Sequence, residues 1–391
     1  MTNEMTYKVT HPWINFEIDL KDLAIKTWIQ LGECASKCDQ ISGVPLKPVI
    51  RDYLQLIYLA KGIKATTAIE GNTLTEEEVK KIIEHKADIP PSKEYLEQEI
   101  KNILKACNMV ADHLRNNIEV VVSPEKIREY NSIVLENLPH PDDIEAGEFR
   151  KHRVTVGRYL GPNPEQVPFL VEKLCDWLNS DSFKPDKNVN PIIYAIIKAI
   201  IAHIYIAWIH PFGDGNGRTA RLIEFKILAQ SGVPSPAIHL LSNHYNNTRT
   251  EYYNQLEKTS KLGGKINDFI SYAVQGFLDG FNEQLPLIRA QQIEVAMENY
   301  IHERFIDLPG KTWTRRRHLA LDILASDKPI RKEEILLLSK RLNDAYKDKN
   351  PRTISRDLAV LLDMGLIRIT DEGFRIDFEP ILAFLPLRKS T

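Results

Sequence analysis

The stretch His210-Pro-Phe-Gly-Asp-Gly-Asn-Gly-Arg-Thr-Ala-Arg221 decides how the rest of the chain is interpreted. It places an imidazole, a carboxylate, three glycines and two guanidinium groups within twelve residues. A hydrophobic core does not use this combination, whereas a site for phosphate groups does. The segment before it, residues 191–209, is almost continuously apolar, which predicts a buried helix leading into the loop.

The composition is that of an ordinary globular protein. The chain has 391 residues, 43% hydrophobic and 27% charged, which suffices for two or three domains. The net charge of −2 argues against wholesale binding to nucleic acid or an anionic membrane. The four cysteines form no CxxC pair and no zinc-type spacing, so we expect plain buried or free thiols.

The cellular location is predicted from the lack of a signal peptide and of a clear membrane-spanning segment. Residues 1–13 show no basic region followed by an apolar one, as a signal peptide would have. Residues 191–209 are long enough to cross a membrane, but Lys198 and His203 interrupt them, which favours a core helix. We therefore expect a cytoplasmic protein without a membrane partner.

Apolar periodicity predicts a mainly α-helical chain. The expected helices are 19–37, 49–70, one opened by the capping box Thr75–Glu78, 93–114, 124–138, 166–178, 191–209, 219–231, 249–261, 265–284 and 286–306. Between glycines 147 and 161, Val154 and Val156 alternate with polar residues, which predicts a small β-hairpin flap.

The last part of the chain has a different pattern. Residues 311–356 are rich in lysine and arginine, with expected helices at 316–325, 332–346 and 351–364 and a hairpin of strands 366–370 and 374–377. Three helices and a hairpin are typical of a winged helix-turn-helix domain. The predicted domains are an N-terminal helical region 1–115, a core 116–290, a connecting helix 291–310 and a winged helix 311–391.

The central stretch has the chemistry of an anion site. Gly215, Asn216 and Gly217 let backbone N–H groups converge at the start of the next helix. Arg218 and Arg221 lie on one helix face and suit an oligophosphate. Asp214 is a candidate ligand for Mg²⁺, and His210 is a candidate general base.

Three other interpretations are less favoured. The flanking patterns are helical, which argues against a simple hairpin turn. The twelfth position counted from Asp214 is Phe225, which excludes a calcium loop that needs an acidic residue there. His210-Pro211 alone would be a helix terminator, but the complete set of residues favours a site.

The stretch resembles the signature of the Fic (filamentation induced by cAMP) family, His-x-Phe-x-(Asp/Glu)-Gly-Asn-Gly-Arg-x-x-Arg, at every specified position. Three further segments are similar to the family: Gly147-x-Phe-Arg150 with the flap, Gln166-Val-Pro168, and Thr248-Arg-x-Glu-Tyr-Tyr-x-x-Leu256. The likeness covers about residues 50–290. It implies a Fic-type helical bundle with a β-hairpin flap.

The resemblance also implies a reaction, the transfer of AMP from ATP to a Ser, Thr or Tyr hydroxyl of a protein, with release of pyrophosphate. His210 would be the base, Asp214 would hold Mg²⁺, and Gly215, Asn216 and Gly217 would bind phosphate oxygens. Arg218 would hold the leaving pyrophosphate and Arg221 the γ-phosphate.

Two further assignments come from the same resemblance. Asn247 would contact the nucleotide. The flap residues Val154, Thr155 and Val156 would dock the backbone of the target protein by strand pairing.

An upstream segment, Thr66-x-x-x-Glu70-Gly71-Asn72, resembles the inhibitory motif of the same family, (Ser/Thr)-x-x-x-Glu-(Gly/Asn). Its implied role is an ion pair between Glu70 and Arg221, which would keep ATP from binding productively. On its own the pattern would be a helix end with a solvated carboxylate. Together with the complete signature it predicts an autoinhibited protein adenylyltransferase.

Other functions stay open from the sequence. Glu70 is compatible with the removal of AMP from a modified target. Residues 352–367 resemble the recognition helix and turn of bacterial winged-helix regulators. Arg352, Ser355 and Arg356 are therefore candidates for reaching DNA, with Arg315–Arg317 on phosphates. Three further alternatives also remain open: the winged helix could bind protein instead of DNA, the protein could modify itself, and it could form a homodimer.

Overall fold

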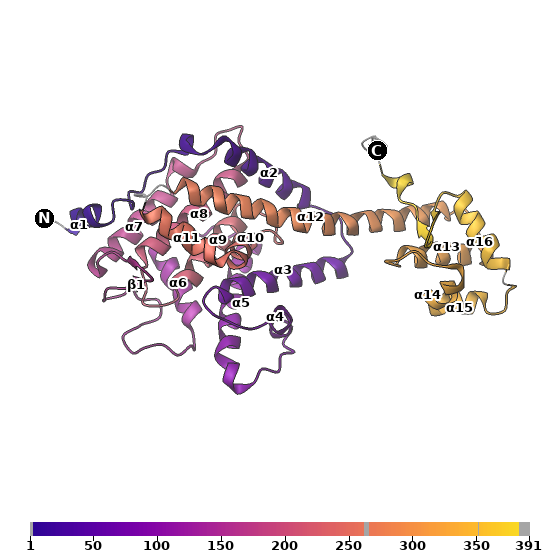
Figure 1. The fold of residues 1–391 in the computed structure, drawn as a ribbon, viewed down its shortest axis with the longest axis horizontal. Coiled ribbons are helices and arrows are strands. Elements are labelled where there is room, and N and C mark those ends of the chain that lie inside the picture. Colours follow the sequence, from indigo (N-terminus) through magenta and orange to yellow (C-terminus); the bar gives the residue numbers. More distant parts are fainter. Residues whose placement is uncertain (1–2, 262–265, 351, 383–391) are drawn as a thin grey trace. The chain divides into compact units, whose positions relative to one another are not determined.

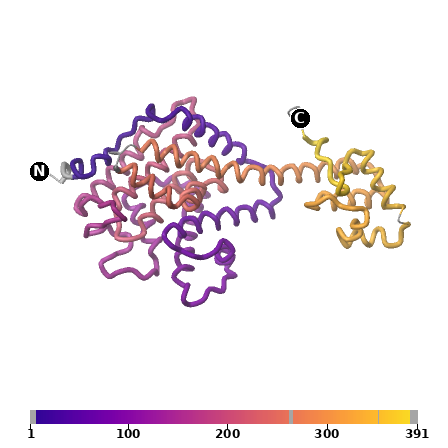
Figure 2. Tube along the Cα trace, in the orientation of Figure 1, coloured from indigo at the N-terminus to yellow at the C-terminus, as the bar shows by residue number. Residues whose placement is uncertain are grey.

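The computed structural model describes residues 3–261, 266–350 and 352–382. The chain divides into two compact units: Met1–Val44 with Pro48–Leu285, and Pro45–Lys47 with Pro286–Thr391. The colour gradient in Figure 2 follows the chain from indigo to yellow through both units. The predicted division at residues 115, 290 and 310 remains a prediction.

The first unit is helical with one small hairpin, as the periodicity predicts (Figure 1). Its helices are α1 Asn3–Thr10, α2 Ile25–Ile41, α3 Pro48–Ala68, α4 Glu76–Ile83, α5 Glu94–Arg115, α6 Pro124–Leu135, α7 Val167–Leu178, α8 Pro191–Ile209, α9 Asn216–Gln230, α10 Leu240–Asn247, α11 Arg249–Lys261 and the start of α12 Asn267–Arg304. The hairpin pairs β1 Thr155–Val156 with β2 Tyr159–Leu160, antiparallel.

Helix α8 is the centre of this unit's core. Asn190 caps it by accepting a hydrogen bond from the N–H of Ile192, and Pro191 occupies the first turn. Of the apolar window that is long enough to cross a membrane, 78% is buried inside the protein. Helix α8 packs against α9, so the loop that joins them starts and ends on buried helices.

Some element boundaries differ from the prediction. The expected helices 265–284 and 286–306 form one continuous helix, α12, with Pro286 inside it. A proline removes one backbone hydrogen bond, and packing on both sides of it, at Leu285 and Ile288, holds the helix together. Residue 265 lies outside the described residues. The short helices α1 and α10 were not predicted.

The second unit has the order of a winged helix-turn-helix domain. It consists of α13 Lys311–Leu324, α14 Ile335–Leu338, α15 Lys340–Tyr346, α16 Arg352–Asp363 and the antiparallel strands β3 Ile367–Thr370 and β4 Gly373–Ile376. The expected single helix 332–346 is wrong, because Ser339 is extended and its side chain caps α15. Pro351 and residues 383–391 lie outside the described residues.

The expectation that Arg315–Arg317 bind DNA phosphates remains a prediction, but Arg315 and Arg316 already have a partner inside the unit. Each donates its Nε–H to the buried carboxylate of Asp357 at 2.8 Å, and Tyr346 donates its hydroxyl to the same carboxylate. These two arginines neutralise a buried charge inside the unit, where breaking the pair would be costly. They therefore stabilise the domain.

Candidate functional site

The loop between α8 and α9 has a constrained backbone. His210 ends α8 in the left-handed region, with φ of 48°, which is uncommon for a residue with a side chain. Phe212 is buried against Phe149. The side chain of Asn216 accepts from the N–H of Phe212 and donates to its carbonyl, both at 2.9 Å. The loop is therefore closed on itself before any ligand binds.

Arg150 holds the strained residue in place. Its Nε–H donates to the His210 carbonyl at 2.7 Å, and its backbone N–H donates to the Pro211 carbonyl at 2.9 Å. Its Nη atoms donate to the carbonyls of His152 and Pro162, which flank the hairpin. One buried guanidinium thus links the base of the flap to the residue before the loop.

The environment of His210 keeps its imidazole neutral. Burial, with a smaller contribution from the positive charge of Arg150, lowers the pKa of His210 to about 4. A hydrogen bond to the Ala207 carbonyl and the carboxylates of Glu70 and Asp214 act in the opposite direction. Because the pKa lies below its usual value, the ring can accept a proton at neutral pH.

The start of α9 is the predicted anion site. Gly215 precedes the helix with φ of 76°, a conformation that favours glycine. Because the first N–H groups of a helix have no intrahelical partner, the N-terminus of α9 attracts negative charge. Among the described residues, Nε of Arg218 and both Nε and Nη1 of Arg221 are buried without a hydrogen-bond partner.

Glu70 pairs with Arg221 as the inhibitory motif implies. Its Oε1 accepts from Nη2 of Arg221 at 2.5 Å, and the Thr66 carbonyl accepts from the same nitrogen at 2.9 Å. Helix α3 ends at Ala68, so Glu70 lies in the turn after it, followed by Gly71 with φ of 108°. Burial raises the pKa of Glu70, but Arg221 outweighs it and leaves the pKa below its usual value.

The carboxylate of Glu70 also lies against the first turn of α9, where an anion site is predicted. A Cβ atom at position 217 would overlap Glu70 Oε1, so the glycine provides the space that this carboxylate occupies. Glu70 therefore meets the N-terminal turn of α9 and Arg221 at once, as a phosphate group would.

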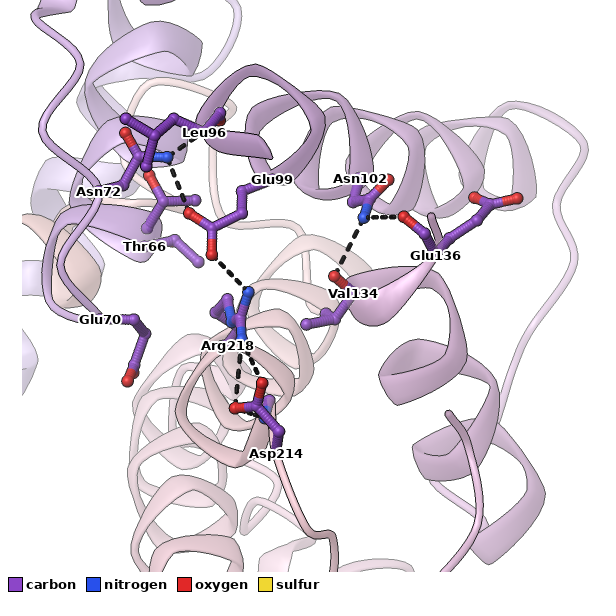
Figure 3. Close-up of polar contacts among 12 residues, drawn as sticks. Thr66, Glu70, Asn72, Leu96, Glu99, Asn102, Val134, Glu136, Asp214 and Arg218 are labelled. Atoms are coloured by element: carbon purple, nitrogen blue, oxygen red, sulfur yellow. Dashed lines mark hydrogen bonds and ion pairs between the residues drawn. The ribbon is translucent and has the colours of Figure 1, made fainter. Parts of the chain in front are cut away.

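Arg218 has partners that the sequence did not indicate. Its Nη1 donates to Glu99 of α5 at 2.8 Å, and its Nη2 lies 3.3 Å from both carboxylate oxygens of Asp214 (Figure 3). Glu99 in turn accepts from Asn72, at 2.8 Å. No motif marks Glu99, because its role depends on the packing of α5 beside the loop.

A second missed residue is Asn131, fully buried on α6. It donates to the Asp214 carbonyl at 2.9 Å and accepts from the N–H of Gly147 at 3.0 Å. It thereby ties the loop to the segment that leads to the flap. A buried asparagine in an amphipathic helix gives no sequence signal for such a contact.

A cavity of about 460 Å³ opens beside the loop, a size typical of small-molecule sites. It is lined by Glu70, Val156, His210, Asn216 and Gly217 from the predicted set, and by Gly157, Arg158, Tyr159, Tyr252, Tyr253 and Leu256 among others. Tyr252 and Tyr253 lie in the segment whose similarity to the family we noted without assigning it a role.

The predicted residues do not all meet in this cavity. Asn247 ends α10, is exposed and is not among the cavity's lining residues, so its contact with a nucleotide remains a prediction. In the flap, Thr155 and Val156 are exposed on a two-residue strand, and the Val154 carbonyl accepts from the N–H of Gly161. The flap's role in docking a target remains a prediction.

Asp214 fits the metal role as a single ligand. Its side chain is 48% exposed beside the anion site. Among residues 3–261, 266–350 and 352–382, no group of three or more His, Cys, Asp or Glu side chains could hold a metal ion. This arrangement suits Mg²⁺, which keeps several waters and is commonly held by one or two carboxylates and substrate phosphates.

Comparison with known proteins finds a family that is similar to the part of the chain that holds this site. Residues 121–228 match the model of the Fic/DOC family. The chain is 33% identical over 210 residues to the protein adenylyltransferase fic-1 of Caenorhabditis elegans, 54% of this chain and 38% of that protein. It is 31% identical over 220 residues to the protein adenylyltransferase Fic of Drosophila willistoni, 56% of this chain and 39% of that protein. The chain thus spans about two fifths of these relatives.

Solved structures agree on the fold. The structure of Fic-1 residues 134–508 from C. elegans has a TM-score of 0.54 at 27% identity, and the match covers 68% of this chain and 73% of that one. A Fic family protein from Desulfovibrio desulfuricans has a TM-score of 0.51 over 90% of this chain and 95% of its own, at 18% identity. The second match supports the fold alone.

The structure predicts that Arg150 adds to the effect of burial on the pKa of His210. Replacing Arg150 by methionine removes a nearby positive charge, so the pKa of His210 should rise above its wild-type value while burial still keeps it low. NMR titration of the histidine rings, with the His210 signal assigned through His210→Asn, measures this shift. The exposed Arg153→Met is the matched control, and a pKa in Arg150→Met that equals the wild-type value would refute the assigned role.

Proposed function

We propose that this protein transfers AMP from ATP to a hydroxyl group of a protein, and that Glu70 restrains the reaction. The observation that carries the proposal is the set of groups where α8 meets α9. The neutral imidazole of His210 and the N-terminus of α9 line the cavity, and α9 also carries the two buried arginines Arg218 and Arg221. The names of the relatives, protein adenylyltransferases, support the same chemistry. The cytoplasmic location is also a proposal.

The phosphate chain of ATP matches the donors at the loop. The first turn of α9 offers backbone N–H groups, and Arg218 and Arg221 keep buried N–H groups that have no partner among the described residues. Donors fixed before substrate arrives stabilise charge that develops at the reacting phosphate without reorganisation. Magnesium held at Asp214 would supply further neutralisation of the phosphates.

His210 is the group that accepts the proton. The hydroxyl of the target attacks the α-phosphorus of ATP, the bond to the bridging oxygen breaks, pyrophosphate leaves and the hydroxyl proton passes to the His210 ring. A ring that is neutral at pH 7 can accept it. The exposed hairpin β1–β2 offers backbone groups to an extended segment of the target.

Glu70 opposes productive binding of the ATP phosphates. A carboxylate beside Gly217 and Arg221 occupies the position that the γ-phosphate requires. ATP that binds while the pair persists keeps its phosphates displaced, so the α-phosphorus does not align with His210. The resting protein is therefore restrained, and whatever withdraws Glu70 activates it.

Glu70→Gly should raise AMP transfer. A charge-assisted hydrogen bond contributes about 1.5–3 kcal/mol, which corresponds to roughly 10- to 150-fold in the population of the open site. Incubation with ATP and Mg²⁺ followed by intact-mass measurement, on the protein itself and with added cell extract, detects the adduct. Glu76→Gly, an acidic residue on α4, is the control.

His210→Ala in the Glu70→Gly background should abolish the adduct while ATP still binds. The same adduct yield with alanine would remove His210 as the base. Equal yields from wild type and Glu70→Gly would refute the inhibitory role of Glu70.

A second function, DNA binding by the winged helix, is favoured by one observation. Arg368 and Arg375 face each other across β3 and β4, and both are exposed. Like charges directly opposite each other in a sheet are destabilising unless an anion lies between them. Arg352, Ser355 and Arg356 are exposed on α16, as the DNA hypothesis requires.

The test is a gel shift of the full chain with a duplex of random sequence at about 50 and 200 mM salt. Arg352→Ala and Arg356→Ala should weaken binding, and each lost phosphate contact should reduce the salt slope by about one. Arg115→Ala, an exposed arginine of the first unit, is the control. No shift at low salt would exclude this function.

A further inference from the structure

The segment that carries Glu70 contacts Arg221 of α9 directly and Arg218 of α9 through Glu99. Glu70 pairs with Arg221, and Asn72, two residues later, donates its Nδ2–H to Glu99 Oε2 at 2.8 Å. The other oxygen of Glu99 accepts from Nη1 of Arg218 at 2.8 Å. Figure 3 shows this chain of contacts from Asn72 through Glu99 to Arg218.

Asn72 is itself fixed in several ways. It is buried, its Nδ2 also donates to the Leu96 carbonyl at 3.0 Å, and its Oδ1 accepts from the N–H of Leu74 at 3.0 Å. Its own N–H donates to the Thr67 carbonyl at 3.2 Å. Hydrogen bonds from Asn72 therefore hold the turn after α3 against α5, and Glu99 accepts one of them.

The charges near the loop favour this closed arrangement. Three carboxylates, those of Glu70, Glu99 and Asp214, surround the two guanidinium groups of Arg218 and Arg221. Arg218 is buried, so a carboxylate partner is needed to offset its desolvation while no nucleotide is bound.

We propose that Glu99 is a second restraint on the site, because it links Arg218 to the segment that carries Glu70 and so couples the release of the two arginines. This inference rests on the proposed function. When Glu70 withdraws from Arg221, the turn 70–72 moves with it, and the link through Asn72 and Glu99 to Arg218 is broken. Conversely, loss of Glu99 loosens the turn and weakens the hold of Glu70 on Arg221.

The first test measures the coupling without any activity. Hydrogen exchange of the full chain is followed in peptides that cover residues 66–75, where the N–H groups of residues 70–72 and 74 are bonded within the turn. Glu99→Gln keeps the size of the side chain and removes its charge. It should speed exchange in these peptides by about 3- to 10-fold, since one charge-assisted bond is lost.

The matched control is Glu97→Gln, the same change on the same helix, at a residue that pairs with Lys101. It should leave exchange in residues 66–75 at the wild-type rate. Equal rates in wild type, Glu97→Gln and Glu99→Gln would overturn the proposal, whatever the protein's activity.

The second test separates restraint from a role in the reaction. AMP transfer is compared in wild type, Glu99→Gln, Glu70→Gly and the double variant. A restraint that acts through Glu70 predicts a rise of about 3- to 10-fold for Glu99→Gln alone and no further rise when Glu70→Gly is already present. A fall in the double variant below Glu70→Gly would overturn the proposal and make Glu99 a positioning residue for Arg218.

A failure of the proposed function has a different pattern. If Glu70→Gly forms no adduct with ATP, adenylyl transfer is refuted. The hydrogen-exchange experiment does not depend on that result, and it still decides whether Glu99 stabilises the turn 70–72.

Discussion

The ion pair between Glu70 and Arg221 is the interaction on which the proposed function depends, because we propose that the phosphates of a nucleotide bind at the same arginine. Arg221 is 1% exposed, so its charge needs a partner at all times. Glu70 provides it in the resting protein, at 2.5 Å, and a triphosphate would provide it in the active state. A single buried guanidinium thus gives the site two mutually exclusive occupants.

The loop itself does not change between these states in our account. His210 is held by Arg150 from the segment below the flap, Phe212 by Asn216 of α9, and Asp214 by Asn131 of α6. Such fixed donors and a fixed base are what transition-state stabilisation requires. Regulation then falls to the turn 70–72, which lies outside the helices and is held by a few polar contacts.

The parts of this site that could be predicted from the sequence are those whose residues lie close together along the chain. The twelve-residue stretch, the inhibitory segment, the hairpin and the winged helix all follow from local pattern. Arg150, Asn131 and Glu99 could not be predicted in their roles, because each acts through contacts between segments far apart in the chain. The ion pairs of Arg315 and Arg316 with Asp357 could not be predicted for a related reason: a run of basic residues has the same sequence pattern whether it faces solvent or a buried carboxylate.

The central claim is that Glu70 and the γ-phosphate compete for Arg221. The direct test is calorimetry of ATP and ADP binding, with Mg²⁺, to wild type and to Glu70→Gln. The account predicts that wild type binds the two nucleotides about equally, and that Glu70→Gln gains affinity for ATP over ADP by about tenfold or more, the worth of a charge-assisted contact. An equal gain for both nucleotides, or none for either, would contradict it.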